Sequence, residues 1–545
     1  MQSKRSYRSL ILLLVLVLGA AALVQEVRAQ NANAILRGVV RDQKEALYGI
    51  LVTAEPKGKN VATSVYTDDN GQYEFPPLAG GEYLVTVGSK QEAVTLGNAP
   101  VSKNFTVELG PDFFRQTSGG SLLGLLPGTD AEKKNVVSNC GSCHSVWRLF
   151  NKARTSPDDW RTLVRRMGLK KGGEGSMDET VAPRVEMGNG NFDFLVKYYS
   201  DNIHPDIKQT KVVEGMFRPR GEAAKAVFEE WNVPPELGGI NTAKPDSKGM
   251  IWFPAGRAAS VARLDPSTGE TKSFPIPTKE RPQGTEGLFH DIMVDHQDNV
   301  WVTGGGLNKV FKLDGKTFEF TIFDIPEDQG TKPHTGELDR DGNYWVTMQT
   351  GKPGKGWVVK LDPRTGKSTP FVTQAEYPHP YGPEPYGLVI GSDGTVWFTE
   401  LFSGKLGKID PKTGKMTEYT VPNPAAGPRR LDMDSKGNLW FTQCFTGSVA
   451  KFDPRTEKFT EYDLGVPGGG FPYSIRVDES DQIWFTLNSH NSVGKLDPAT
   501  GKITHALFPK PESTTIDPDF DMTAKRPTLV YGTHRAAVGR VYFRP

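Results

Sequence analysis

Hydrophobic and polar positions alternate in short runs over residues 34–108, the pattern of strands that bury one face. Turn clusters such as Asp68–Gly71 separate these runs. The runs themselves are Ile35–Val40, Ile50–Ala54, Ser64–Thr67 and Tyr83–Val87. We therefore expect a small antiparallel β-sandwich in this part of the chain.

The spacing of apolar residues changes towards that of a helix between residues 109 and 215. Ser156-Pro157 is a start signal for one of the expected helices. The segments with helical spacing are Ala131–Val137, Asp158–Met167 and Phe192–Tyr199. The pattern predicts a small all-α domain.

The remaining residues repeat the unit D-x-x-G-x-(I/V/L)-W-(F/V)-T, and its tryptophans lie 49, 44, 52, 43 and 44 residues apart. They are Trp252, Trp301, Trp345, Trp397, Trp440 and Trp484. A β-rich repeat of this length is typical of the blades of a β-propeller. We expect the tryptophans to pack between blades, and contact with a ligand is the alternative.

One more period after Trp484 reaches Tyr531, in a degenerate seventh blade that lacks its outermost strand. Phe228–Pro234 is similar in sequence to the outer strand Met416–Pro422. We therefore expect the start of the propeller to complete its last blade, which hides two strand edges. The predicted fold class is multidomain and mainly β, with an N-terminal β-sandwich, a small all-α domain and a C-terminal seven-bladed β-propeller.

The first 29 residues read as a secretory signal peptide: basic residues precede an apolar run from Leu10 to Val24, and a small-x-small site ends at Ala29. A retained anchor helix is the alternative, but the run is shorter than the roughly 18 to 20 residues that span a bilayer. We expect a periplasmic or secreted chain without a membrane span. With 65 basic and 64 acidic residues the net charge is +1, which argues against nucleic acid as a partner.

Cys140, Cys143 and His144 form the motif C-x-x-C-H. Two thiols at this spacing attach haem covalently, and the adjacent imidazole is the proximal ligand to iron. A redox dithiol, a zinc half-site and coincidence are the alternatives. Zinc needs a second pair of ligands, and the remaining cysteine, Cys444, stands alone and is expected to be a buried thiol. The motif predicts one covalently bound haem c.

With this motif between its helices, the segment 111–215 resembles a small class I cytochrome c. The resemblance implies a methionine as the sixth iron ligand. Met167, in W-x-x-x-V-x-x-M, is the first candidate for this distal ligand, and Met187 is the alternative. Met167 could also merely pack against the porphyrin.

The N-terminal segment contains G-x-V-x-D, T-x-x-x-G-x-Y-x-F and L-x-x-G-x-Y in this order. They are carried by Gly38, Val40, Asp42, Thr67, Gly71, Tyr73, Phe75, Leu78, Gly81 and Tyr83. This order resembles the carboxypeptidase regulatory-like family. The resemblance implies an accessory module without catalysis, suited to folding, surface contact or carbohydrate binding.

The repeat P-x-G-(I/L)-x-x-x-x-D-G-x-(V/L)-W-F-T-E is clearest from Pro385 to Glu400 and is similar to the streptogramin lyase (virginiamycin B lyase) family. The resemblance implies elimination by a general-base histidine and a magnesium ion that glutamates hold. The tentative catalytic residues here are His290, His334 and Glu400. At the family spacing, however, His290 pairs with Gly304, His334 with Met348 and Tyr386 with Glu400, so no blade holds both a histidine and a glutamate.

The entry positions of successive blades should converge on the central channel and make a polar mouth for a ligand. They are His290, His334, Tyr386, Arg429, Arg430 and Tyr473, together with Glu400 and Gln443. An ordinary hydrated channel without a substrate is the alternative.

Three functions are compatible with these motifs. The first is a periplasmic monohaem electron-transfer protein whose propeller binds a substrate or a redox partner. A haem favours redox chemistry over elimination here, because elimination needs no electron sink. The second is a lyase-like enzyme with an accessory haem module, and the third is a scaffold that binds carbohydrate or the cell envelope. The predicted divisions are 1–29 for the signal, 30–110 for the sandwich, 111–215 for the haem domain and 222–545 for the propeller.

Overall fold

The computed structural model describes residues 33–140, 145–166, 189–240, 242–277, 289–350, 354–374, 377, 382–511, 515–533 and 537–545. The predicted signal peptide, Cys143, His144, Met167 and Met187 lie outside these ranges. No helix within them is both long enough and apolar enough to cross a bilayer. The chain divides into two compact units.

The first unit contains the chain up to Glu108 together with Arg218–Val227. One sheet has the order β10-β2-β5, with β9 also on β2, and another contains β4-β3-β7-β8, while β1 pairs with β6. The strands are β1 (Asn33–Ala34), β2 (Leu36–Arg41), β3 (Leu51–Pro56), β4 (Ala62–Tyr66), β5 (Gln72–Glu74), β6 (Leu78–Ala79), β7 (Gly81–Val87), β8 (Lys90–Leu96), β9 (Val101–Ser102) and β10 (Phe105–Thr106). The buried Tyr73 packs on Phe75 and Phe105, and its hydroxyl donates to the carbonyl of Lys103. The predicted β-sandwich is confirmed.

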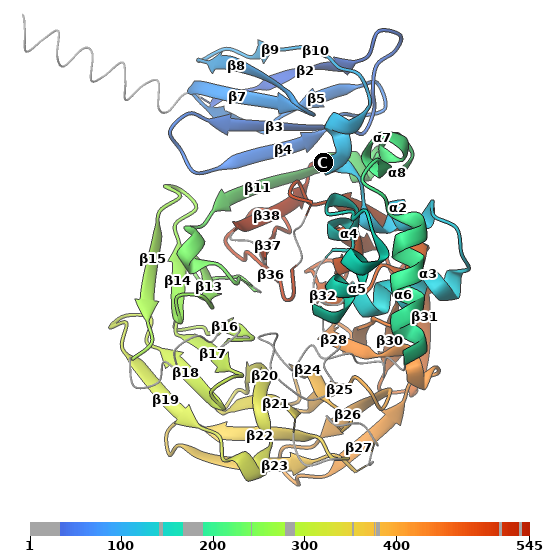
Figure 1. Cartoon of the computed structure of the whole chain (residues 1–545). Coiled ribbons are helices and arrows are strands. Elements are labelled where there is room, and N and C mark those ends of the chain that lie inside the picture. Colours follow the sequence, from blue (N-terminus) through green and yellow to red (C-terminus); the bar gives the residue numbers. More distant parts are fainter. Residues whose placement is uncertain are drawn as a thin grey trace, which may run out of the picture. The chain divides into compact units, whose positions relative to one another are not determined.

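The second unit contains Leu109–Phe217 and Phe228–Pro545. Six antiparallel sheets of four strands follow one another along the chain and form a ring (Figure 1). The first three blades are β12 (Lys244–Pro245), β13 (Ile251–Ala255), β14 (Ser260–Leu264), β15 (Thr271–Pro275); β16 (Ile292–Val294), β17 (Val300–Gly304), β18 (Lys309–Leu313), β19 (Phe320–Asp324); and β20 (Thr331–Leu338), β21 (Tyr344–Thr350), β22 (Trp357–Asp362), β23 (Lys367–Val372). The next three are β24 (Pro385–Ile390), β25 (Val396–Glu400), β26 (Lys405–Ile409), β27 (Met416–Thr420); β28 (Pro428–Met433), β29 (Leu439–Gln443), β30 (Ser448–Asp453), β31 (Lys458–Asp463); and β32 (Pro472–Val477), β33 (Ile483–Leu487), β34 (Ser492–Leu496), β35 (Ile503–Leu507).

The seventh blade joins the two ends of the propeller sequence. Its strands follow the order β36 (Asp519–Phe520), β37 (Leu529–Thr533), β38 (Ala537–Phe543) and β11 (Ala226–Asn232). The hydroxyl of Tyr531 on β37 bonds the carboxylate of Glu230 on β11 at 3.0 Å. The prediction that the start of the propeller completes its last blade is therefore confirmed.

The repeated tryptophans are all buried and pack into the core of the following blade. Trp440, for example, lies in one cluster with Ile475 and Ile483. In five blades the indole N–H also donates to an aspartate six residues earlier, at 2.9–3.0 Å. The predicted role in the inter-blade core is confirmed. An aspartate six residues before the tryptophan is the sequence signal for this bond, and Trp397, which lacks the bond, has Gly391 at that position.

Replacing the aspartate of one such pair should destabilise the propeller. Asp434 accepts bonds from the indole of Trp440 and from the backbone of Lys436 and Asn438. Asp434→Ala leaves a buried indole N–H unsatisfied, so we expect a loss of about 2–3 kcal/mol in the free energy of unfolding, measured by urea denaturation. Asp393→Ala is the control, because the bonds that Asp393 accepts within the described part of the chain come from its neighbour Thr395, and a loss as large there would contradict this explanation.

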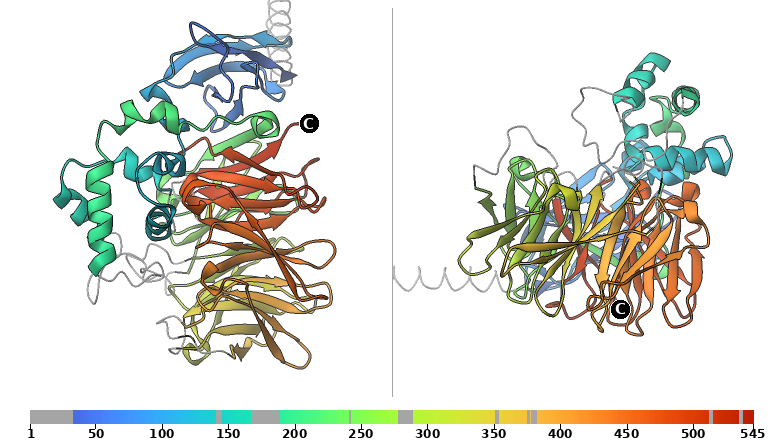
Figure 2. Two further views of the ribbon diagram at one scale, coloured as in Figure 1. Left: turned by 90° about the vertical axis from the view of Figure 1, so that its right-hand side faces the viewer. Right: turned by 90° about the horizontal axis from the view of Figure 1, so that it is seen from below.

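The helical segment lies over part of one face of the propeller (Figure 2). Its helices are η1 (Pro111–Gln116), α2 (Gly119–Gly124), α3 (Asp130–Cys140), α4 (Trp147–Asn151), α5 (Pro157–Arg166), α6 (Asn189–Asn202), α7 (Ile207–Thr210) and α8 (Val212–Gly215). Helices α2 and α3 contact η8 (Pro467–Gly469), and α2 also contacts η9 (Asn488–His490). The hydroxyl of Ser145 donates to the carbonyl of Ser489 at 3.3 Å. We call residues 109–217 the cap.

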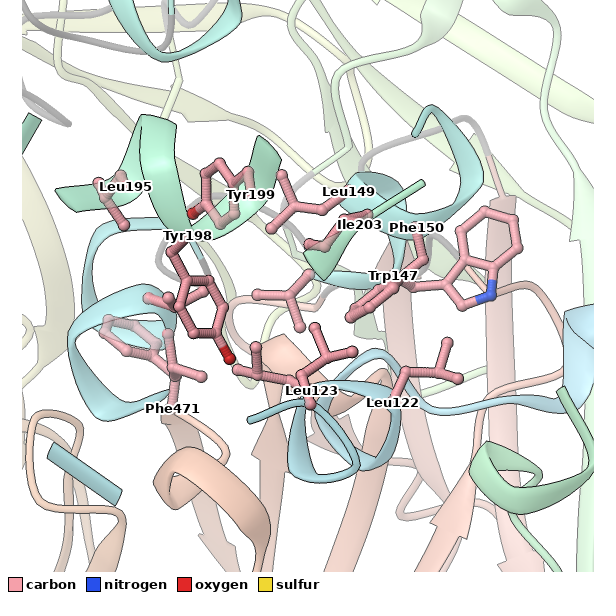
Figure 3. Packing of buried hydrophobic residues seen from close by; sticks show 14 of the residues in the cluster. Leu122, Leu123, Trp147, Leu149, Phe150, Leu195, Tyr198, Tyr199, Ile203 and Phe471 are labelled. Atoms are coloured by element: carbon pink, nitrogen blue, oxygen red, sulfur yellow. The ribbon is translucent and has the colours of Figure 1, made fainter. Parts of the chain in front are cut away.

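The prediction of a small all-α cytochrome domain is wrong. Among the described residues only α3, α5 and α6 have seven or more residues. The buried residues of the cap, such as Leu123 and Tyr198, also form no core of their own, because they share one cluster with Phe471 and Tyr473 of the propeller (Figure 3). Helical spacing in the sequence showed which faces are apolar but not that the propeller covers them.

Candidate functional site

The candidate site lies where the inner strands of the blades begin. Strands β20, β24, β28 and β32 contact one another in this order around the channel. Their first residues therefore meet near the axis, as in other propellers. We call the following residues the mouth cluster: His290, His334, Tyr386, Arg429, Arg430 and Tyr473.

Two histidines and a tyrosine stack at the start of the second, third and fourth blades. The ring centroids of His290 and His334 are 3.6 Å apart, and those of His334 and Tyr386 are 4.0 Å apart. Nδ1 of His334 lies 2.9 Å from the hydroxyl of Thr335 and 3.2 Å from the carbonyl of Tyr386. These contacts fix the orientation of the His334 ring.

A guanidinium and two phenols continue the cluster. The hydroxyls of Tyr386 and Tyr473 are 2.6 Å apart, and Nη2 of Arg429 donates to the Tyr386 hydroxyl at 2.6 Å. The guanidinium carbon of Arg429 lies 3.6 Å from the centre of the Tyr473 ring. All three side chains are at most 3% exposed. Tyr386 and Tyr473 belong, with Phe471, to the apolar cluster that also contains the buried residues of the cap.

Arg430 points into a network of buried charges instead. Its Nη1 lies 2.8 Å from the Thr335 hydroxyl, 3.4 Å from Asp291 and 3.8 Å from Asp517. Asp517 also pairs with Lys244 and Arg476, at 2.8 and 2.9 Å. Burial acts to raise the pKa of Asp517, but the surrounding cations hold it below its usual value. Sequence reasoning missed this network, because Lys244 and Asp517 stand outside the repeated motif.

The net pKa shift of Asp291 is opposite to that of Asp517, because the pKa of Asp291 lies above its usual value. Desolvation raises the pKa of this carboxyl, and Arg430 offsets only part of the shift. The carboxylate of Asp291 accepts the backbone N–H of Ile292 and pairs with Arg430. Its contribution is to neutralise an arginine within the channel.

Glu400 is buried at the end of β25, and the contacts found for its side chain lie within its own blade. Ser403 donates to its carboxylate, and Glu418, which pairs with Lys405, is its charged neighbour. Gln443, at the end of β29, likewise accepts a bond from Ser448 of the same blade. Within the described residues no group of three His, Cys, Asp or Glu side chains could hold a metal ion. The donors found here therefore do not fit a magnesium ion shared by Glu400 and a mouth histidine.

The carboxyl of Glu400 gives a pH-dependent contribution to stability. Burial and the neighbouring Glu418 raise its pKa from 4.5 to about 8. Because the folded-state pKa is raised, this contribution is complete below about pH 4.5 and is lost as the pH rises through about 8. Glu400→Gln should remove this loss. At about pH 9 its free energy of unfolding, measured by urea denaturation across pH, should exceed that of the wild type by on the order of 2 kcal/mol. An unchanged pH profile would contradict the assignment.

Of the predicted haem residues, the structure describes Cys140. This cysteine ends α3 and packs against the apolar cluster of cap and propeller. The residue is half-buried, and its sulfur lies 2.7 Å from the hydroxyl of Tyr199, whose ring centroid is 5.0 Å from that of Trp160. Cys444 is a buried cysteine whose sulfur lies 4.0 Å from Nη1 of Arg429.

Comparison with known families supports two of the resemblances found in the sequence. A model of the Virginiamycin B lyase family matches residues 354–518, and a model of the carboxypeptidase regulatory-like domain matches residues 35–112. The virginiamycin B lyase of Nocardia farcinica (strain IFM 10152) is 29% identical over 227 residues, which cover 36% of this chain and 74% of that protein.

Solved structures show the same propeller fold. Selenomethionine-substituted virginiamycin B lyase from Staphylococcus aureus matches with a TM-score of 0.51 and 20% identity, over 58% of this chain and all of that one. A streptogramin B lyase structure matches with a TM-score of 0.50 and 24% identity, over 58% of this chain and 98% of that one. The chain thus contains a streptogramin lyase-like β-propeller, which favours the second of the three functional hypotheses over the first. These comparisons provide no support for haem or electron transfer.

Proposed function

We propose that the mouth cluster binds a small substrate and that the protein is an exported oxidoreductase with a haem attached to Cys140 and Cys143. The position of Cys140 carries this proposal. Its side chain packs against the same cluster as Tyr386 and Tyr473. A group joined to this sulfur would therefore adjoin the apolar cluster that the cap shares with Tyr386 and Tyr473, although the cap is not a separate cytochrome fold.

The surroundings of Cys140 fit a porphyrin. Cys140 is half-buried, and its sulfur lies beside the hydroxyl of Tyr199, whose ring packs on the fully buried Trp160. His144 would be the proximal iron ligand, and Met167 or Met187 the distal one, in agreement with the sequence motif. When bound, a haem of this kind accepts and releases one electron at a time.

The residues of the chain would bind the substrate and receive its proton. Arg429 is suited to orient an acceptor group, and His290 or His334 to take a proton from a substrate that is being oxidised. Each one-electron oxidation of the substrate would transfer one proton to an imidazole. The electron would pass on to a partner redox protein. Arg429 and His334 are buried, which strengthens the electrostatic contacts between them and a bound substrate.

A change in the mouth cluster should alter the midpoint potential of the haem. Tyr473→Phe removes a buried hydroxyl beside Arg429, whereas Tyr462→Phe, on the outer strand β31, serves as the matched control. We expect a shifted potential in an anaerobic redox titration of the first variant only. Equal potentials in the wild type and in Tyr473→Phe would overturn the proposed proximity.

A second candidate is a lyase that opens a cyclic ester, and the likeness of the propeller to streptogramin lyases favours it. The oriented ring of His334 would act as the base that removes the proton next to the ester carbonyl. Because Glu400 and the mouth histidines do not fit a shared metal site, Arg429 and Tyr386 would donate hydrogen bonds to the carbonyl oxygen.

Incubation with a streptogramin tests the lyase candidate directly. We expect a ring-opened product, detected by mass spectrometry, and its loss in His334→Ala. The absence of product with the wild type, in the presence and absence of magnesium, would contradict this candidate.

Two further assignments belong to the proposal. The chain would act in the periplasm or outside the cell, in agreement with the signal-like sequence before Gln30. Its regulatory-like sandwich would serve as an accessory module that binds carbohydrate or cell-envelope polymer. A pull-down with purified envelope polymer tests the module, and wild-type binding that survives deletion of residues 34–108 would contradict it.

A further inference from the structure

Arg429 is a buried cation for which the structure shows no counter-charge. Its guanidinium is 2% exposed, and its Nε has no hydrogen-bond partner. No carboxylate of the described residues pairs with it. The adjacent Arg430 is equally buried but has Asp291 and Asp517 within 4 Å. Of these two consecutive arginines, Arg430 thus has carboxylates beside it, and Arg429 has none among the described residues.

The neighbours of Arg429 do not supply the missing charge. They are the phenols of Tyr386 and Tyr473, the ring of Phe471 and the sulfur of Cys444 at 4.0 Å, which is a weak acceptor at most. Cation–π contacts offset part of the cost of removing a guanidinium from water. A buried ion without a paired opposite charge nevertheless remains costly, and the usual solution is an anion with a matching geometry.

We propose that Arg429 binds the carboxylate of an aromatic ligand in the mouth cluster. A guanidinium presents parallel N–H donors that match the two oxygens of a carboxylate. The aromatic side chains around it favour a planar, apolar body attached to that carboxylate. The inference deepens the proposed function, on which it rests, because it names the substrate class of the same site.

A carboxylate could reach Arg429 from two sources. One is a free aromatic acid, and the other is a carboxylate that belongs to the bound cofactor itself. The recognition chemistry is the same in both cases. The full chain with haem attached and a Cys140→Ser/Cys143→Ser chain without it distinguish the two sources.

Calorimetric titration with benzoate tests the proposal, and benzamide is the matched neutral probe. We expect saturable binding of benzoate, at least tenfold weaker binding of benzamide, and a comparable loss in Arg429→Gln. Arg429→Lys keeps the positive charge but lacks the parallel N–H donors of a guanidinium. Its affinity for benzoate should lie between those of the wild type and Arg429→Gln. Arg455→Gln, at an exposed arginine paired with Asp453, should bind like the wild type.

The pattern across the two protein forms identifies the source of the anion. Benzoate binding in both forms indicates a free acid as ligand, whereas binding only in the chain without haem indicates that the cofactor provides the carboxylate. No saturable binding in either form, or equal binding of benzoate and benzamide, would overturn the proposal. If the exported chain carries no haem, benzoate should still bind to it. A failure of the proposed haem attachment is therefore distinguishable from a failure of the proposed carboxylate binding.

Discussion

Gly120→Ala should detach the cap from the propeller. A methyl group at this position would lie 1.8 Å from Cε1 of the buried His490 ring, so one of the two elements must move. We expect a cost of about 3 kcal/mol, at the upper end of the range for overpacking, because the ring that must move is buried. The measurement is hydrogen exchange over residues 119–137, which should become faster.

Gly110→Ala is the matched control for the cap. Its added methyl group would meet no atom within 4 Å, and exchange in the cap should remain that of the wild type. Equal protection in the two variants would show that the cap does not dock through α2 and η9.

Acid should weaken the same contact. Burial, with a smaller effect of His505, lowers the pKa of His490 from 6.5 to about 3, and burial lowers that of His505 to about 4. Since the folded-state values are depressed, the unfolded chain binds more protons between about pH 6.5 and 3, and stability falls as the pH falls through this range. For His490 alone we expect a loss of about 3 kcal/mol between about pH 6.5 and 4.

Urea unfolding at a series of pH values measures this effect. His490→Phe should flatten the profile on the acid side, although the new ring alters the packing of α2. His204→Gln, at an exposed position, is the control. A wild-type profile that stays flat between pH 6.5 and 4 would exclude a buried neutral His490.

The repeated part of the fold could be predicted from the sequence because each blade carries its own signal. The spacing of the tryptophans predicted the blades. The similarity of Phe228–Pro234 to an outer strand predicted the closure of the ring. The same repeat placed Tyr386 and Arg429 at equivalent inner positions, which the structure brings together.

The parts that the sequence did not predict depend on contacts between unlike segments. Helical periodicity identified the apolar faces of the cap, but Leu123 and Tyr198 carry no information about Phe471 as their partner. The WFTE motif placed Glu400 near the mouth by analogy. Its contacts with Ser403 and Glu418 instead follow from side-chain direction, which spacing alone does not determine.

We propose that the cap carries a covalent haem beside the propeller mouth. The most direct test of this proposal is the pyridine haemochrome spectrum, with intact mass, of the full chain exported by cells that contain the haem attachment machinery. The account predicts the band of a c-type haem and a mass increase of one haem per chain, both lost in Cys140→Ser/Cys143→Ser. A chain with the mass of the unmodified polypeptide and no haemochrome band would contradict it.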